Sequence, residues 1–255
     1  MKRNFWKKTA AGLLSLMLVT GSLPANTPVQ DLFSGIVLTA HAAEAVASGF
    51  CGDSSVHEGK DVTWTITENP KEKQEDATTY TLTISGSGAM ENYIPYEMMY
   101  IQGHCAPYLD RFEASIKSII IEDGVTHIGE SAFYECENLT SVTISDSVTS
   151  IGEYAFSFCS SLSSVDIPES VAFIGAGAFC GCSSLISAVL PENLITLTEG
   201  MFDDCQNLKT VNIPDGVEFI PNYMFFGCKN LASVSIPDSV TSIGKAAFAM
   251  CESLT

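Results

Sequence analysis

The apolar residues in the C-terminal half of the chain recur with a spacing of 23 residues. Three columns keep this period through six units: Cys136, Cys159, Cys182, Cys205, Cys228 and Cys251; Phe133, Phe156, Phe179, Phe202, Phe225 and Phe248; and Leu139, Leu162, Leu185, Leu208, Leu231 and Leu254. A period of about 20 to 29 residues is typical of proteins built from stacked coils of chain. We therefore predict a repeat domain over residues 121–255, with five complete coils and a truncated sixth.

The repeat at residues 144–166 shows how one coil is expected to fold. Leu162, Val165 and Ile167 have the alternation of a β-strand, and a proline ends that strand because it lacks an N–H donor. Residues 153–158, which precede this strand in the coil, suit one helical turn. Since a single coil cannot bury its apolar side chains, each column is expected to stack on its copy about 4.8 Å away.

A glycine follows the second apolar run in most coils and permits a bend there. It is Gly129, Gly152, Gly175 and Gly244 in four of the coils. In the fourth and fifth coils Thr198 and Pro221 replace the glycine, and Met201 and Met224 replace the following alanine. These two coils are expected to be locally irregular.

Residues 43–120 precede the repeats and follow a different pattern. Apolar residues alternate with threonines in segments 62–66 and 80–84, and a polar stretch, 69–78, separates them. This pattern predicts a β-hairpin. Its apolar face is expected to cover the first coil, whose core would otherwise be open to water.

Residues 1–42 have the pattern of an export signal. Four basic residues precede an apolar run at 9–20, which is too short to cross a membrane core of about 30 Å comfortably. We place cleavage after Ala42, in the small-x-small sequence Ala40-His41-Ala42. Cleavage after Ala25 and an uncleaved membrane anchor are the alternatives. The mature chain is expected to be secreted or held at the cell surface, without a membrane span.

Acidity dominates the composition. The 255 residues include 30 acidic and 12 basic ones, which gives a formal net charge of −18. Removal of residues 1–42 would leave 29 acidic and 8 basic residues and a net charge of −21. Such a chain cannot bind nucleic acid by neutralising phosphates, and anionic lipid repels it. No nucleic-acid partner is therefore expected.

The repeat sequence resembles that of a known family. Residues 236–254 read IPDSVTSIGKAAFAMCESL, which resembles the BspA-type leucine-rich repeat of bacterial surface proteins, and the resemblance covers residues 121–255. Segments 51–52, 64–66, 82–90 and 106–108 look like the flanking segment that often precedes such repeats. The resemblance implies an α/β leucine-rich-repeat solenoid, with a parallel sheet on one face, short helical turns on the other and a small β-rich N-terminal cap. It also implies an extracellular binding or adhesion role.

The cysteine column is interpreted as a row of buried thiols. Zinc needs ligands that converge on one point, and a disulfide needs Cβ atoms about 3.8 Å apart, whereas stacked side chains run parallel. Cys180 lies outside the column and is expected to be exposed and unpaired. Cys51 and Cys105 lie in the flanking segment and could pair outside the cell. A zinc site formed by these two with His57 and His104 is the alternative, although the spacing matches no standard pattern.

Two surface features are candidates for ligand contact. A row of acidic residues occupies one repeat position: Asp123, Asp146, Glu169, Glu192, Asp215 and Asp238. The row could bind a cation or a basic partner, or it could reflect the suitability of Asp for the turn after proline, which is the preferred interpretation. Phe173 and Phe219 share a position two coils apart, with Ile195 near them. They could form an apolar contact patch, although packing within loops is preferred.

No catalytic site is predicted. A Ser-His-carboxylate triad would need one of His57, His104 and His127, and nothing in the sequence marks such a set. The predicted function is therefore non-catalytic binding of an extracellular protein or glycan, with no cofactor and no metal. One alternative is a passive spacer that carries an enzyme, dockerin or wall anchor beyond Thr255, because the truncated sixth coil indicates a fragment. The other alternative is a hydrolase within this chain.

Overall fold

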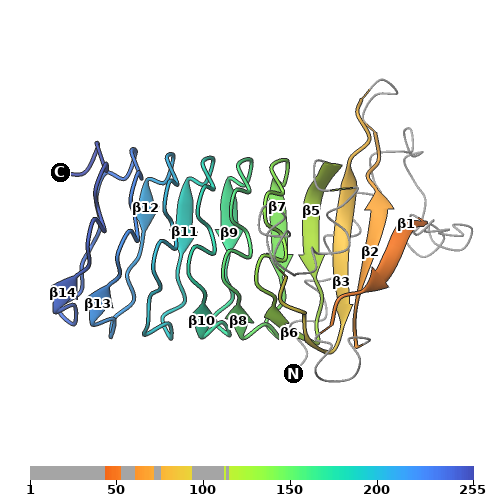
Figure 1. Cartoon of the computed structure of the whole chain (residues 1–255), viewed down its shortest axis with the longest axis horizontal. Helices are drawn as coiled ribbons and strands as arrows, with labels where there is room; N and C mark the ends of the chain where they lie inside the picture. The colour runs from red at the N-terminus through yellow and green to blue at the C-terminus, as the bar shows by residue number, and fades with distance from the viewer. Residues whose placement is uncertain (1–43, 53–60, 72–75, 94–111, 113–114) are drawn as a thin grey trace, which may run out of the picture. The chain divides into compact units, whose positions relative to one another are not determined.

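The structure is a computed structural model that describes residues 44–52, 61–71, 76–93, 112 and 115–255. The expected export signal, Cys105, His57 and His104 lie outside the described residues. The described part is one compact unit of β-strands and turns (Figure 1). Coils 1 to 6 are residues 121–143, 144–166, 167–189, 190–212, 213–235 and 236–255.

Strands that follow the leucine in coils 1 to 4 belong to the first layer of sheet. A five-stranded sheet contains, in spatial order, β1 (Ala45–Phe50), β2 (Val62–Glu68), β3 (Tyr80–Gly86), β5 (Ile116–Ile121) and β7 (Ser141–Ile144). A three-stranded sheet follows with β9 (Ser164–Asp166), β11 (Ser187–Val189) and β12 (Thr210–Val211). From β3 onward the pairs are parallel, and in the coils each residue pairs with the one 23 positions later, as Ser118 does with Ser141 and Ser164 with Ser187. The period found in the sequence is thus the pairing register.

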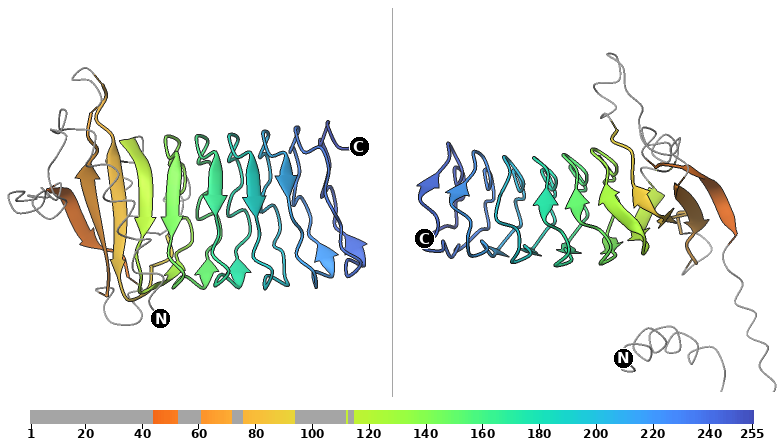
Figure 2. Two further views of the ribbon diagram at one scale, coloured as in Figure 1. Left: turned by 180° about the vertical axis from the view of Figure 1, so that it is seen from behind. Right: turned by 90° about the horizontal axis from the view of Figure 1, so that it is seen from below.

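A second layer of parallel strands, which the sequence did not predict, lies along another side of the coils (Figure 2). Its first sheet contains β4 (Gly88–Ala89), β6 (Val125–Ile128), β8 (Ser150–Ile151) and β10 (Phe173–Ile174). Its second sheet contains β13 (Phe219–Ile220) and β14 (Ser242–Ile243). The fold is therefore leucine-rich-repeat-like, with parallel strands on two sides rather than on one.

The third side of each coil consists of turns, and the expected helical turn at residues 153–158 is not present. The amides of Tyr154, Phe156 and Phe158 donate to carbonyls of the next coil, at 2.9, 2.9 and 2.7 Å. In a single α-helical turn over this segment the amide of Phe158 would donate to the carbonyl oxygen of Tyr154 instead. Tyr154 and Phe158 also have positive φ angles, of 53° and 60°, which a right-handed helix excludes. Bonding between coils has thus replaced helix formation.

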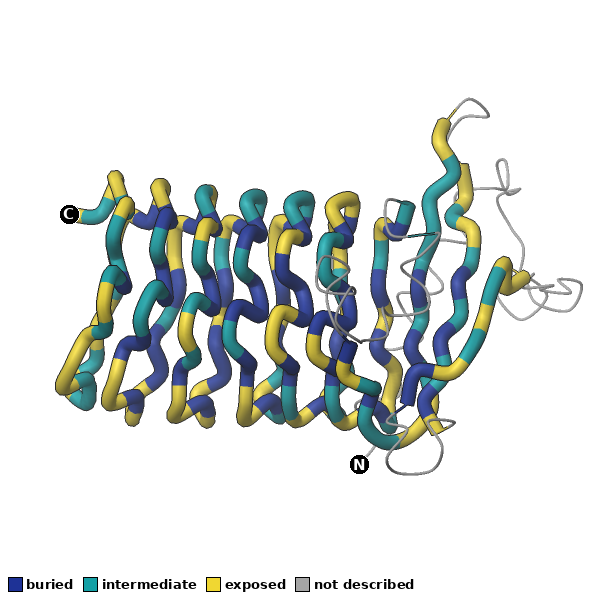
Figure 3. Tube along the Cα trace, viewed as in Figure 1, coloured by how far each residue is buried: buried dark blue, intermediate teal, exposed yellow. Residues whose placement is uncertain are grey.

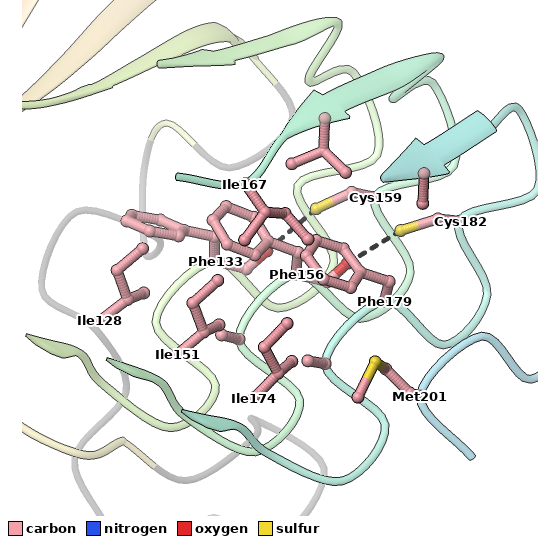
Figure 4. Packing of buried hydrophobic residues seen from close by; sticks show 14 of the residues in the cluster. Ile128, Phe133, Ile151, Phe156, Cys159, Ile167, Ile174, Phe179, Cys182 and Met201 are labelled. Atoms are coloured by element: carbon pink, nitrogen blue, oxygen red, sulfur yellow. Dashed lines mark hydrogen bonds between the residues drawn. The ribbon is translucent and has the colours of Figure 1, made fainter. Parts of the chain in front are cut away.

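The core is a set of stacked columns enclosed by the three sides (Figure 3). Phe133, Phe156 and Phe179 are fully buried, with ring centroids 5.1 and 5.6 Å apart in successive coils (Figure 4). The column continues to Phe248 at similar spacing. Neighbouring rings at this distance attract each other beyond the gain from burial, which favours in-register stacking.

The flanking segment contains the expected hairpin, but the hairpin does not lie across the end of the core. Strands β2 and β3 pair antiparallel, with Trp64 opposite Ile84. Strand β3 then pairs parallel with β5, so that Leu82 lies opposite Ile119 and the hairpin extends the sheet edge to edge. Strand β4 pairs with β6 in the second layer. Residues 80–93 therefore act as an additional rung that precedes coil 1.

Gly86 forms the corner between these two layers. Its φ is 117°, and a Cβ there would lie 2.0 Å from the carbonyl oxygen of Asp61. Both the backbone conformation and the close approach require glycine.

Candidate functional site

The cysteine column lies inside the core. Cys136, Cys159, Cys182, Cys205 and Cys228 have no exposed surface, whereas Cys251 in coil 6 is half-buried. Burial raises the pKa of Cys182 to about 12 and raises the pKa of Cys159 and of Cys205 well above its usual value.

Ionised thiolates are therefore scarce in the column at neutral pH. The thiolate is the form of cysteine that binds metals and attacks electrophiles, so the burial that raises the pKa of Cys182 also hinders both reactions. In the described part of the chain, no group of three or more His, Cys, Asp or Glu side chains could hold a metal ion.

Most thiols of the column have a structural partner that the sequence did not indicate. The Sγ of Cys159 donates to the carbonyl oxygen of Phe133 at 3.3 Å, and that of Cys182 donates to the carbonyl oxygen of Phe156 at 3.1 Å (Figure 4). Cys205, Cys228 and Cys251 repeat the contact, each with the phenylalanine of the preceding coil at 3.1 Å. The column therefore joins successive coils in addition to filling space.

The structure describes two cysteines outside the column, and Cys180 is less accessible than expected. Cys180 is partly buried, and burial followed by the charge of Asp203 raises its pKa to about 11. Cys51 is buried, and burial followed by the charge of Glu91 raises its pKa to about 12. Since Cys105 lies outside the described residues, its pairing with Cys51 stays a prediction, as does the zinc site.

All six residues of the acidic row are exposed, at the corner that joins the two layers of strands. Some of them bond to the neighbouring coil: the hydroxyl of Ser145 donates to the carboxylate of Asp123, and the amide of Glu192 donates to the Glu169 carboxylate at 3.2 Å. These bonds join neighbouring coils at the corner, and the row also lines the corner with negative charge. Whether the row binds a cation or a basic partner stays a prediction.

A small depression lies where the five-stranded sheet ends and the three-stranded sheet begins. Its volume is about 190 Å³, and it is lined by Val142, Thr143, Ile144, Asp146, Asp166 and Pro168. Pockets that enclose small organic ligands usually measure about 300 to 1,000 Å³. The depression is therefore too small for such a ligand.

Three exposed apolar side chains lie along the second-layer side of coils 3 to 5, and we call them the apolar strip; Ile243 of β14 in coil 6 is exposed as well. Phe173, Ile195 and Phe219 expose 47%, 67% and 45% of their surface. Ile174 and Ile220, which follow the two phenylalanines, are fully buried, as the alternation of a strand requires. The preferred interpretation of these residues as loop packing is wrong, because about half or more of each side chain is open to solvent.

The apolar strip lies over a break in the second layer. Coil 4 contributes no strand there, so that β10 and β13 belong to separate sheets. In the regular coils the amide of the bend glycine donates to the preceding coil, as Gly175 does to Ile151 at 2.8 Å. At this position Thr198 instead donates through its hydroxyl, to the carbonyl oxygen of Ile174 at 2.9 Å. Pro221 in coil 5 has no N–H to donate.

The bend glycine has no room for a Cβ beside it, which explains why its replacement in coil 4 comes with a different hydrogen bond. At Gly152 and Gly175 a Cβ would lie 2.5 and 2.4 Å from the backbone nitrogens of Glu130 and Glu153. Thr198 must therefore stand farther from coil 3 than a glycine would. The irregularity expected for coil 4 is found, and the side chain of Thr198 at the glycine position contributes to it. Coil 5, which was also expected to be irregular, retains strand β13.

A hydrogen-bonded row of polar side chains on the second layer was missed by the sequence reasoning. His127 Nδ1 lies 2.8 Å from Ser150 Oγ, and His127 Nε2 lies 3.4 Å from Asn92 Oδ1. The signal in the sequence was the 23-residue separation of His127 and Ser150, which places them in one column. Asn92 contributes a neutral amide oxygen at Nε2, whereas a catalytic triad pairs the histidine with a carboxylate.

The sequence profile described as "BspA type Leucine rich repeat region" matches residues 111–232 and 218–255, with six copies. Among curated proteins, none matches the chain. Among solved structures, a T. pallidum leucine-rich repeat protein is 27% identical with a TM-score of 0.56, and the match covers 74% of this chain and 88% of that one. A leucine-rich cell surface protein from Faecalibacterium prausnitzii A2-165 is 30% identical with a TM-score of 0.52, and the match covers 75% of this chain. The chain spans about half, 52%, of that second protein.

Among the described residues, no helix is long and apolar enough to cross a bilayer.

Proposed function

Since the chain belongs to the BspA-type leucine-rich repeat family, whose members are often bacterial surface proteins, we propose that it is a non-catalytic binding or adhesion protein. In this proposal residues 1–42 direct export, residues 43–120 cap the first coil, and residues 121–255 form a solenoid that presents the ligand-binding surface. The protein acts outside the cell, either secreted or held at the surface. Its ligand is an extracellular protein or glycan.

The observation that carries the proposal is the exposure of the three apolar side chains of the strip. Scattered exposed apolar residues are common, but three that are close together on a rigid surface are typical of contact sites. The buried phenylalanine and cysteine columns fix the coils beneath them. A preformed surface of this kind loses little conformational entropy when a large ligand binds.

The test is binding of the purified chain to an array of matrix proteins, mucins and glycans. Saturable binding at or below micromolar concentration is the expected result. An array without any such binding would contradict the adhesion function and favour the passive spacer, in which the coils only hold another module at a distance.

Export is tested separately, through the mass of the protein recovered outside the cell. We expect an N-terminus at Ala43. An N-terminus at Asn26 would support the alternative cleavage site, and a cell-bound protein that retains Met1 would support the uncleaved anchor.

The absence of catalysis is tested at Ser150 and His127. Turnover of ester, peptide or glycoside substrates that disappears in Ser150→Ala would overturn the non-catalytic function. Equal background rates for the chain and for Ser150→Ala are the expected result.

A further inference from the structure

The apolar strip has a geometry that suits an extended polypeptide. Neighbouring parallel strands lie about 4.8 Å apart, so Phe173 and Phe219, which are two coils apart, are separated by roughly 10 Å. Ile195 lies between them in coil 4, and its Cγ2 is 3.8 Å from the position that a Cβ would take at Gly216. The strip therefore crosses three consecutive coils.

The strip is bordered by carboxylates. On the corner side lie Glu169, Glu192 and Asp215, one in each of the three coils, and all are exposed. Glu218 directly precedes Phe219, and Glu199 follows the bend on the other side of coil 4; both are exposed as well. An apolar ligand that covers the strip must therefore lie among negative charges.

Acidic residues outnumber basic ones in the three coils that carry the strip: residues 167–235 contain seven acidic residues and two lysines, Lys209 and Lys229. Between Lys117 and Lys209 the sequence contains 13 acidic residues and no lysine or arginine. At the edge of this region burial, and then the charge of Glu153, raise the pKa of Glu130. The negative potential extends over several coils and can attract a positively charged partner before contact.

We infer that the apolar strip is the docking site for a cationic polypeptide segment that carries apolar side chains between its basic residues. The inference rests on the proposed binding function and names the chemistry of its partner. Apolar side chains of the segment would cover Phe173, Ile195 and Phe219, and its lysines or arginines would face the bordering carboxylates. A second copy of this chain fits less well, because it would bring the same carboxylates to the interface. Nucleic acid and anionic lipid carry the wrong charge.

The test uses the purified chain and a fluorescent peptide of about eight alternating lysines and leucines, which in extended form spans roughly 26 Å. Two control peptides replace the leucines with serines or the lysines with glutamates. Fluorescence anisotropy measures binding at low and at physiological salt. We expect the lysine–leucine peptide to bind and both controls to bind at least about tenfold more weakly, with an affinity that falls as salt rises.

Protein variants locate the site. The double variant Ile195→Ser with Phe219→Ser is expected to lose at least about tenfold in affinity. The matched control is Val189→Ser on the first layer, whose side chain is exposed to 64%, close to the 67% of Ile195. Its affinity is expected to stay within about twofold of that of the unchanged chain. Circular dichroism and thermal unfolding check that each variant is folded.

A second pair of substitutions tests the charge without changing the apolar surface. Glu192→Gln with Glu218→Gln is expected to weaken binding and to reduce its dependence on salt. The inference would be overturned if the lysine–serine peptide bound as tightly as the lysine–leucine peptide. It would also be overturned if both double variants bound the lysine–leucine peptide as tightly as the unchanged chain does. If array ligands still bind while the peptide does not, the inference fails and the proposed function stands. If neither binds, both fail.

Discussion

The thiol of Cys182 in coil 3 donates a hydrogen bond to the carbonyl oxygen of Phe156 in coil 2, at 3.1 Å. The same oxygen accepts the amide of Cys159 within its own coil, at 3.3 Å. The Phe156 carbonyl oxygen thus accepts one hydrogen bond that closes a turn within coil 2 and a second one from coil 3. This double use explains why cysteine, which is small, apolar and able to donate weakly, occupies the position in every coil.

Replacement of Cys182 by alanine should destabilise the chain by about 1–2 kcal/mol, because it removes buried volume and a weak hydrogen bond between coils. Denaturant unfolding monitored by circular dichroism measures this change. Cys180→Ala is the control, since its side chain is partly exposed, and it should cost less than about 0.5 kcal/mol. Equal effects of the two substitutions would show that the thiol column has no special role.

The cysteine column should make the fold sensitive to alkali. Burial raises the pKa of Cys159, Cys182, Cys205 and Cys228 above the usual value of 9.0. Because these pKa values are raised in the folded state, the stability that they contribute is present below pH 9.0 and is lost as the pH rises toward the folded-state values. Each thiol should lower the free energy of unfolding by about 1.4 kcal/mol per pH unit in that range.

Unfolding in denaturant at several pH values between neutral and strongly alkaline, under reducing conditions, measures this slope. Cys205→Ala should make the slope shallower by the contribution of one thiol. A free energy of unfolding that does not change through about one pH unit above the usual thiol pKa would contradict the assigned burial.

Phe179→Ala should cost about 3–5 kcal/mol, as large truncations in a packed core do. Its ring is fully buried between Phe156 and Phe202, with centroids 5.6 and 5.8 Å away. The comparison variant is Phe158→Ala, because the ring of Phe158 is 43% exposed. A thermal transition that barely shifts in Phe179→Ala would refute the stacked core.

Two glycines that look alike in the sequence should respond differently to alanine. At Gly152 a Cβ would lie 2.5 Å from the backbone nitrogen of Glu130, so Gly152→Ala forces neighbouring coils apart and should cost about 2 kcal/mol or more. At Gly200 the φ is +60°, but nothing lies closer to a Cβ than 3.7 Å. Tyr154 and Tyr223 adopt similar angles, 53° and 55°, at the same repeat position. Gly200→Ala should therefore cost about 1 kcal/mol, as a lone positive φ does, and thermal unfolding compares the two.

The core and the register could be predicted from the sequence, because a fixed period places identical residues above one another. The phenylalanine and cysteine columns needed no further information. The hairpin at segments 62–66 and 80–84 was also visible, since alternation with threonine is local. The way in which the hairpin joins the coils could not be predicted. A hairpin that pairs with the edge of the sheet has the same alternating pattern as one whose apolar face packs across the end of the core.

The sequence did not predict the second layer, and it predicted a helical turn where the structure has a different turn. Short elements and contacts between coils are the reason. Strands such as Ser150–Ile151 are two residues long, too short for alternation to be recognised. The segment 153–158 has spacing compatible with a helix, and only the neighbouring coil, which accepts its amides, decides against one. Phe173, Ile195 and Phe219 were already candidates in the sequence, and the structure showed that their side chains are exposed.

The most direct test of the binding function combines the array with the strip variants. A ligand that the unchanged chain retains should be lost or weakened at least about tenfold by Ile195→Ser with Phe219→Ser, and should be kept by Val189→Ser. That outcome would place extracellular binding on the second layer, over the break in coil 4. Retention of every ligand by the strip variant, or equal loss in both variants, would contradict the account.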